Sequence, residues 1–187
     1  WIDESKQDLK RYKDYLIRQI EKSDIEVRYH CDATKCKEEL KNADSIIVAV
    51  GAQPVVPHIK GIDQSHVMNA LYAYEHQAEI KEQVVIVGGG SVGTELAKLL
   101  AKQNKKVTIV EYQKQLCSNL NEHVRMGLLQ QLSMSGDIDI LLESECKEIH
   151  SNTIIVETKD GIKTIYADTV IISVGMKSRR DIANEFY

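Results

Sequence analysis

Apolar positions along the chain recur with two different periods, which predicts a mixture of helices and strands. Near the start they are three and four residues apart, the spacing of one helix face, and this predicts a helix over 5–20. Further along, β-branched apolar runs at 84–87 and 107–110 flank a helical pattern over 92–103. The central part of the chain is therefore expected to form a strand–helix–strand unit.

A helix that is capped by Asn121 and ends before Gly136 is expected next, with three apolar residues on one face: Val124, Leu128 and Leu132. From Asp137 the runs become short and alternating, which predicts strands at 138–142, 145–150, 153–157 and 163–166. Asp160-Gly161 is a hairpin turn signal between the last two. Helix–strand alternation followed by a β-meander predicts an α/β fold, with a Rossmann-like three-layer dinucleotide-binding domain and an antiparallel β-meander.

The segments before the central unit also have strand character. Strands are expected at 26–30 and 45–50, and short helices around 34–41 and 69–77. Residues 43–51 closely parallel residues 167–175, and each stretch ends at a glycine, Gly51 and Gly175. Because nucleotides lie beyond the carboxyl ends of parallel strands, this pair is expected to mark two crossings between domains. Pro54 and Pro57 predict a rigid connector up to Gly61.

The sequence Gly-Gly-Gly-Ser-Val-Gly at 88–93 is the strongest chemical motif. It follows an apolar strand and opens a helix, which is the context of a dinucleotide-binding fingerprint. Gly88 is expected to permit the tight turn, Gly90 to admit a pyrophosphate, and Gly93 to let the helix pack on the strand. Backbone N–H groups near Ser91 and Val92 are expected to face the phosphates. The alternative, a plain glycine-rich turn, does not explain the acid at the end of the next strand.

That acid is Glu111, and it predicts which nicotinamide cofactor binds. A carboxylate at the tip of the second strand accepts hydrogen bonds from the adenosine ribose hydroxyls, whereas the 2′-phosphate of NADPH would meet a like charge. Lys114 is the one nearby cation that argues the other way. We therefore expect NADH in preference to NADPH; the alternative for Glu111 is a solvated acid at a strand end.

Residues 84–111, together with Ala49-Val50-Gly51-Ala52-Gln53-Pro54 and the following residues up to Gly61, resemble the pyridine nucleotide-disulfide oxidoreductase superfamily. Within it, they are most similar to the FAD/NAD-binding portion of NADH:flavin oxidoreductases of the 2-enoate reductase and 2,4-dienoyl-CoA reductase type. The sequence departs from that pattern at Val50, Lys60 and Ser178. The resemblance implies that Gly51 and Gly175 pass beside the nucleotides and that Glu95 lies near the nicotinamide. The alternative for Glu95 is an exposed acid that stabilises the start of a helix.

The resemblance also implies a domain order: a partial FAD-binding segment at 1–62, the NAD(H)-binding domain at 63–167, and a return strand into the FAD-binding domain at 168–187. The glycine motif that opens an FAD domain of this family does not occur here, so we expect a fragment that binds FAD poorly and is inactive alone. In the parent, NADH would pass hydride to FAD, and electrons would continue through an iron–sulfur cluster and FMN to an activated C=C bond. The alternatives are a fragment of an NADH oxidase or of a disulfide reductase, or a non-catalytic NADH-sensing module.

The amino-acid composition of the chain limits the kinds of binding partner that we expect. The chain has 187 residues and a net charge of −4, and its longest apolar runs are short, so neither nucleic acid nor a membrane is expected as a partner. Four cysteines in such a chain fit reduced thiols and a cytoplasmic location. Cys31 and Cys36 have the C-x-x-x-x-C spacing of a redox pair but lack its glycine-rich surroundings, so ordinary thiols are favoured. No spacing predicts a metal site, and exposed sheet edges favour homo-oligomers.

Overall fold

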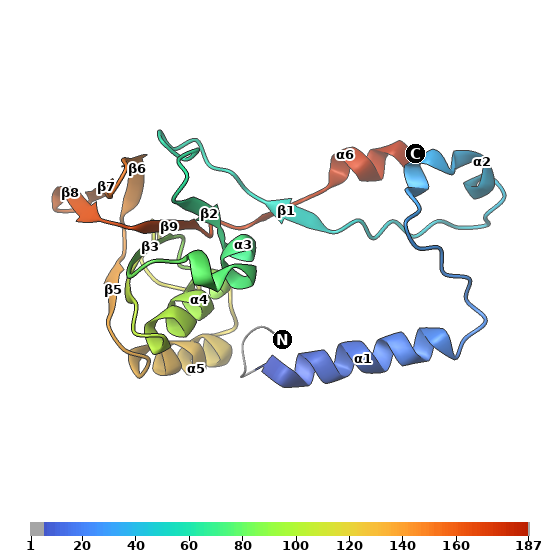
Figure 1. Cartoon of the computed structure of the whole chain (residues 1–187), viewed down its shortest axis with the longest axis horizontal. Helices are drawn as coiled ribbons and strands as arrows, with labels where there is room; N and C mark the ends of the chain where they lie inside the picture. The colour runs from blue at the N-terminus through green and yellow to red at the C-terminus, as the bar shows by residue number, and fades with distance from the viewer. Residues whose placement is uncertain (1–5, 187) are drawn as a thin grey trace. The chain divides into compact units, whose positions relative to one another are not determined.

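The computed structural model of the chain describes residues 6–186, and all of their side chains except those of residues 37 and 39. It divides into two compact units (Figure 1). One unit comprises Pro54–Met176 and contains the glycine motif. The other combines the chain up to Gln53 with the chain from Lys177 onward.

The Pro54–Met176 unit is built on a five-stranded parallel sheet. Its strand order is β2-β9-β3-β4-β5, and every neighbouring pair is parallel. The strands are β2 (Val67–Asn69), β3 (Gln83–Val87), β4 (Lys106–Val110), β5 (Ile138–Leu141) and β9 (Thr169–Ile172). The chain runs outward from β3 through β4 to β5 and then returns to the opposite side of β3 at β9. The order therefore reverses beside β3, and such switch points are where open α/β sheets bind ligands.

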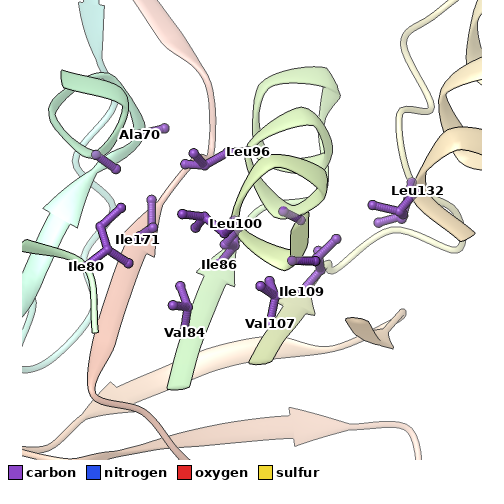
Figure 2. Close-up of a cluster of buried hydrophobic side chains, with 14 of the residues drawn as sticks. Ala70, Ile80, Val84, Ile86, Leu96, Leu100, Val107, Ile109, Leu132 and Ile171 are labelled. Atoms are coloured by element: carbon purple, nitrogen blue, oxygen red, sulfur yellow. The ribbon is translucent and has the colours of Figure 1, made fainter. Parts of the chain in front are cut away.

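Helices cover one face of this sheet. They are α3 (Ala70–Glu75), the short 3-10 helix η3 (Gln77–Glu79), α4 (Ser91–Lys102) and α5 (Glu122–Ser133). Side chains from alternate strand positions pack against them, among them Val84 and Ile86 of β3 (Figure 2). Leu96 and Leu100 of α4 are fully buried in this cluster, because they lie one helical turn apart on the same face.

An antiparallel meander covers the other face. It consists of β6 (Glu145–Ile149), β7 (Thr153–Thr158) and β8 (Gly161–Tyr166). The remaining positions of β3, Val85 and Val87, pack against Ile154 and Val156 of the meander. A strand that is covered on both sides has apolar residues at consecutive positions, which explains the unbroken run at 84–87. The helix layer, the sheet and the meander confirm the predicted α/β three-layer fold (Figure 1).

The structure confirms most elements of the central part and corrects two details. Asn121 caps α5 as predicted, and its side chain accepts a hydrogen bond from the backbone N–H of His123. Val124, however, is 60% exposed, so only Leu128 and Leu132 of the predicted face are buried. The strand at 138–141 was expected at the start of the meander but pairs in parallel with β4. Its short alternating pattern suits an edge strand of either sheet, so the pattern alone did not decide between them.

The second unit contains helix α1 (Gln7–Glu21), η2 (Ala33–Lys35), α2 (Lys37–Leu40), α6 (Arg180–Ala183) and η4 (Asn184–Phe186). The predicted strands at 26–30 and 45–50 are wrong, because neither segment is in a strand. Ile47 in the second of them is 92% exposed. A buried strand needs neighbours that satisfy its backbone and cover its side chains, and the described part of the chain places none beside these segments.

Two short strands, β1 (Ala52–Pro54) and β10 (Met176–Ser178), pair where the chain passes from one unit to the other. The division falls after Gln53 and after Met176, outside the expected boundaries at 62/63 and 167/168. The connector after Pro54 belongs to the larger unit because Ile59 and Ile62 pack under the meander. None of the helices in residues 6–186 has both the length and the apolar composition that a membrane crossing requires.

Candidate nucleotide-binding site

The turn after β3 depends on glycine at two positions. Gly88 has φ +106°, a conformation that side chains other than glycine rarely adopt, and a Cβ there would overlap the carbonyl oxygen of Ser173. Gly93, in the first turn of α4, is buried against the turn, and a Cβ would overlap the carbonyl oxygen of Gly88. These contacts hold α4 directly against the ends of β3 and β9.

Gly90 differs from these two because the space beside it is open. It is the N-cap residue of α4, with φ −68° and ψ −177°, and a Cβ would meet no atom within 4 Å. Its carbonyl accepts the first bond of the helix, from the N–H of Thr94 at 2.9 Å. The N–H groups at the start of a helix have no partner within the helix and carry its partial positive charge, so those of Ser91 and Val92 are available to an anion.

Glu111 stands at the tip of β4 and fixes the same turn from the side. Its side chain is 6% exposed. Oε2 accepts a hydrogen bond from the backbone N–H of Gly89 at 2.6 Å, and Oε1 accepts one from the N–H of Gln113 at 2.8 Å. These two hydrogen bonds offset part of the free-energy cost of removing the carboxylate from water. Each oxygen keeps a further lone pair that can accept another hydrogen bond.

A cavity of about 820 Å³ opens along the carboxyl ends of the strands. Its wall includes the turn after β3, the tip of β4, Ser173 to Met176 after β9, and Ser144 after β5. This volume lies in the range of cofactor and small-molecule sites. Among the described residues that line it, the ionisable acids are Glu111 and Glu145, and no lysine or arginine lines it.

The structure brings most of the predicted residues together. Six of them line this cavity: Gly88, Gly90, Ser91, Val92, Glu111 and Gly175. Gly93 lies beneath the turn instead, as its expected packing role requires. Glu95 is half-buried on α4 and is not part of the cavity wall. Gly51 belongs to the other unit, where its carbonyl accepts a hydrogen bond from the N–H of Arg179 at 3.2 Å.

Several residues of the cavity wall were not predicted from the sequence. They include Pro57 to Ile59 in the connector, Ala70 and Leu71 at the start of α3, residues between Tyr112 and Asn119 after β4, and Ser144 to Cys146 at the passage from β5 to β6. Each of the last three segments follows the carboxyl end of a parallel strand. Recognition of β5 as parallel would have placed Ser144 at this edge, because all carboxyl ends of a parallel sheet meet there.

Two buried cysteines also line the cavity. Burial raises the pKa of the Cys117 thiol, which donates to Oγ1 of Thr94 at 3.3 Å. Burial likewise raises the pKa of Cys146 to about 11. Both side chains are therefore protonated at neutral pH and contribute packing rather than charge. Within residues 6–186, His, Cys, Asp and Glu side chains form no group of three that could hold a metal ion.

The glycine turn, the amides at the start of α4 and the buried acid at the tip of β4 form one wall of a cavity at the switch point of the sheet. The family model for pyridine nucleotide-disulphide oxidoreductases matches residues 4–186. The chain belongs to this family. The sequence resemblance to the superfamily is thereby confirmed, and its members include NADH-dependent flavoprotein oxidoreductases.

Individual relatives agree with this membership. The chain is 30% identical to an NADH oxidase of Thermoanaerobacter brockii over 172 residues, which cover 89% of this chain and 26% of the relative. It is 29% identical to a cinnamate reductase of Clostridium sporogenes over 166 residues, with 87% and 25% covered. A solved 2-naphthoyl-CoA reductase complex superposes with a TM-score of 0.78 at 26% identity, with 92% and 26% covered. The chain thus spans about a quarter of the length of these proteins.

Proposed function

We propose that the Pro54–Met176 unit binds NADH in the cavity along the carboxyl ends of its sheet. The open position at Gly90 carries this proposal: a pyrophosphate beside it would meet no Cβ at residue 90 and would lie at the start of α4, near the N–H groups of Ser91 and Val92. The positive end of the α4 dipole stabilises the anion, which explains how it binds in a wall without lysine or arginine.

The adenosine end of the nucleotide is assigned to Glu111. Each oxygen of its carboxylate accepts one backbone hydrogen bond and can accept a second from a ribose hydroxyl. The 2′-phosphate of NADPH would lie beside this buried carboxylate, and the described wall contains no lysine or arginine to neutralise it. Repulsion between like charges at such a contact costs several kcal/mol, so the site favours NADH over NADPH.

We further propose that the protein to which this chain belongs reduces an activated C=C bond. NADH held along the carboxyl ends of the sheet would supply a hydride, and FAD held by the longer flavoprotein would supply the group that takes it up. The residues of this chain contribute by binding and orienting the dinucleotide at the end of β3 and β9. Two relatives support the substrate class, because their names specify cinnamate and 2-naphthoyl-CoA, both of which carry conjugated unsaturation.

Binding is tested by titrating the purified chain with NADH, NADPH and FAD while its thermal unfolding is followed. NADH at about 100 times its dissociation constant should stabilise the fold by roughly 2.7 kcal/mol. NADPH at the same concentration should stabilise it less, and FAD least. Equal stabilisation by NADPH would contradict the role of Glu111, and no stabilisation by NADH would contradict the site itself.

The substrate class is tested on the longer protein. We expect it to oxidise NADH in the absence of oxygen when an α,β-unsaturated carboxylate or its CoA thioester is supplied. The relative named as an NADH oxidase supplies the alternative. NADH consumption that requires oxygen and does not respond to unsaturated acids would favour that activity.

A further inference from the structure

Two thiols of the smaller unit lie in direct contact. The Sγ atoms of Cys31 and Cys36 are 3.3 Å apart. Cys36 Sγ also lies 3.6 Å from the carbonyl oxygen of Asp32, to which its S–H donates. Either thiol can be the donor in the contact between the two sulfurs. The sulfurs of a disulfide are about 2.05 Å apart, so these two atoms must approach each other by roughly a further 1.3 Å to form one.

Local hydrogen bonds hold the two thiols in this position. The side chain of Asp32 accepts from the N–H of Thr34 at 3.1 Å and from its hydroxyl at 2.8 Å, which caps the turn between the cysteines. The N–H of Cys36 donates to the carbonyl of Ala33 at 3.1 Å. These hydrogen bonds all lie within residues 32–36, so local structure contributes to holding the two sulfurs close together.

The pair is also accessible, unlike the other two cysteines. Cys31 is exposed and Cys36 is half-buried, whereas Cys117 and Cys146 are buried. A soluble oxidant therefore reaches Cys31 first. The spacing alone favoured ordinary thiols, because it lacks the glycine-rich surroundings of the family's redox pair. The contact between the sulfurs is the observation that changes this interpretation.

We propose that Cys31 and Cys36 form a reversible disulfide by exchange with low-molecular-weight disulfides, independently of the nucleotide site. The Cys31 thiolate attacks one sulfur of the small disulfide and releases one thiol. The Cys36 thiolate then attacks Sγ of Cys31 and releases the second thiol. In total, two protein thiols are oxidised, one small disulfide is reduced to two thiols, and the two protons leave with those thiols.

Oxidised glutathione is the probe for this proposal. The full chain is incubated with it, alkylated, digested with trypsin and analysed by mass spectrometry without reduction. Cleavage after Lys35 separates the two cysteines, so the disulfide joins two peptides that are otherwise distinct. We expect this linked pair in the wild-type chain, whereas Cys117 and Cys146 should be alkylated only after denaturation.

The variant Cys36→Ser separates this mechanism from simple reactivity of an exposed thiol. Without the second sulfur, Cys31 should retain glutathione, at a level about tenfold above that of the wild-type chain, because the resolving step is absent. Cys31→Ser should form neither the linked peptides nor a comparable adduct. Glutathione that persists on Cys31 of the wild-type chain, disulfide-linked dimers, or an absence of oxidation would each overturn the proposal.

Discussion

The backbone N–H of Gly89 donates a 2.6 Å hydrogen bond to the carboxylate of Glu111, and this bond joins the turn after β3 to the tip of β4. Gln113 donates to the other carboxylate oxygen at 2.8 Å. The acid that we assign to the ribose therefore also sets the shape of the turn that we assign to the pyrophosphate. Changes at this side chain should affect both ends of the bound dinucleotide.

We predict that Glu111→Gln lowers the affinity for NADH by about 10- to 100-fold, since hydrogen bonds to charged groups contribute about 1.5–3 kcal/mol. A glutamine amide can accept from only one of the two backbone donors, because its NH₂ group faces the other. The loss of charge should also reduce the preference for NADH over NADPH. Isothermal titration with both nucleotides measures the two effects.

The matched control is Gln113→Ala, which preserves the backbone N–H that bonds to Glu111 and leaves the carboxylate in place. This variant should retain the wild-type ratio of the two affinities. An unchanged ratio in Glu111→Gln would show that the carboxylate does not face the ribose.

The strand–helix–strand unit was predictable because its signals are local. The apolar runs of β3 and β4, the helical spacing of α4 and the glycines between them all lie within residues 84–110. The segment 45–50 has a similarly apolar run and 26–30 a weaker one, yet neither forms a strand, because a strand requires a paired neighbour and not only a suitable composition. A local apolar pattern therefore predicts a strand only where another strand lies beside it to pair with.

The residues of the candidate site could likewise be predicted only in part from the sequence. Gly88, Gly90 and Glu111 lie in one continuous stretch, residues 84–111, and were predicted individually. Ser144, in the turn after β5, and Leu71, in the first turn of α3, line the same cavity although they are far apart in the sequence, and only the order of the strands brings them together. The parallel pairing of β5 with β4 could not be derived from four alternating residues at 138–141.

Substitution by alanine should have different effects at two glycines of the motif: it should weaken NADH binding at Gly90 and lower the stability of the fold at Gly93. Gly90→Ala places a methyl group in open space at an ordinary backbone conformation, so stability should change by less than about 0.5 kcal/mol. That methyl group enters the position that we assign to the pyrophosphate, and NADH binding should fall at least tenfold, by about 1.4 kcal/mol. Gly93→Ala forces a methyl group onto the carbonyl of Gly88 and should destabilise the fold by about 1–3 kcal/mol.

Gly127→Ala provides the control for an added methyl group remote from the cavity. It lies within α5, where a Cβ meets nothing within 4 Å, so the change should stabilise the helix by about 0.5–1 kcal/mol and preserve NADH binding. Urea unfolding and NADH titration of the three variants test both properties. A Gly90→Ala protein that binds NADH normally would exclude the pyrophosphate from this turn.

Cys146 should make the stability of the fold depend on alkaline pH. Its side chain is 3% exposed, and burial raises its thiol pKa from 9.0 to about 11, with Glu145 adding to the rise and a backbone bond at Glu148 opposing it.

In the unfolded chain this thiol ionises near pH 9, whereas the folded chain keeps the proton until near pH 11. The stabilising effect is therefore complete below pH 9 and is lost as the pH rises to 11. Over this window the free energy of unfolding should fall by up to about 1.4 kcal/mol per pH unit from this group. Tyrosines and lysines also titrate there, so the contribution must be measured as a difference between variants.

The contribution of Cys146 can be isolated by urea unfolding between about pH 8 and pH 11. Three proteins are compared: the wild-type chain, Cys146→Ala and Cys31→Ala. Cys146→Ala should be less stable at the lower pH, because a buried side chain is truncated, but its stability should decline less steeply as the pH rises. Cys31→Ala removes an exposed thiol and should follow the wild-type slope. Parallel curves for Cys146→Ala and the wild-type chain would mean that the thiol ionises alike in the folded and unfolded states, which a side chain enclosed between the sheet and the meander does not allow.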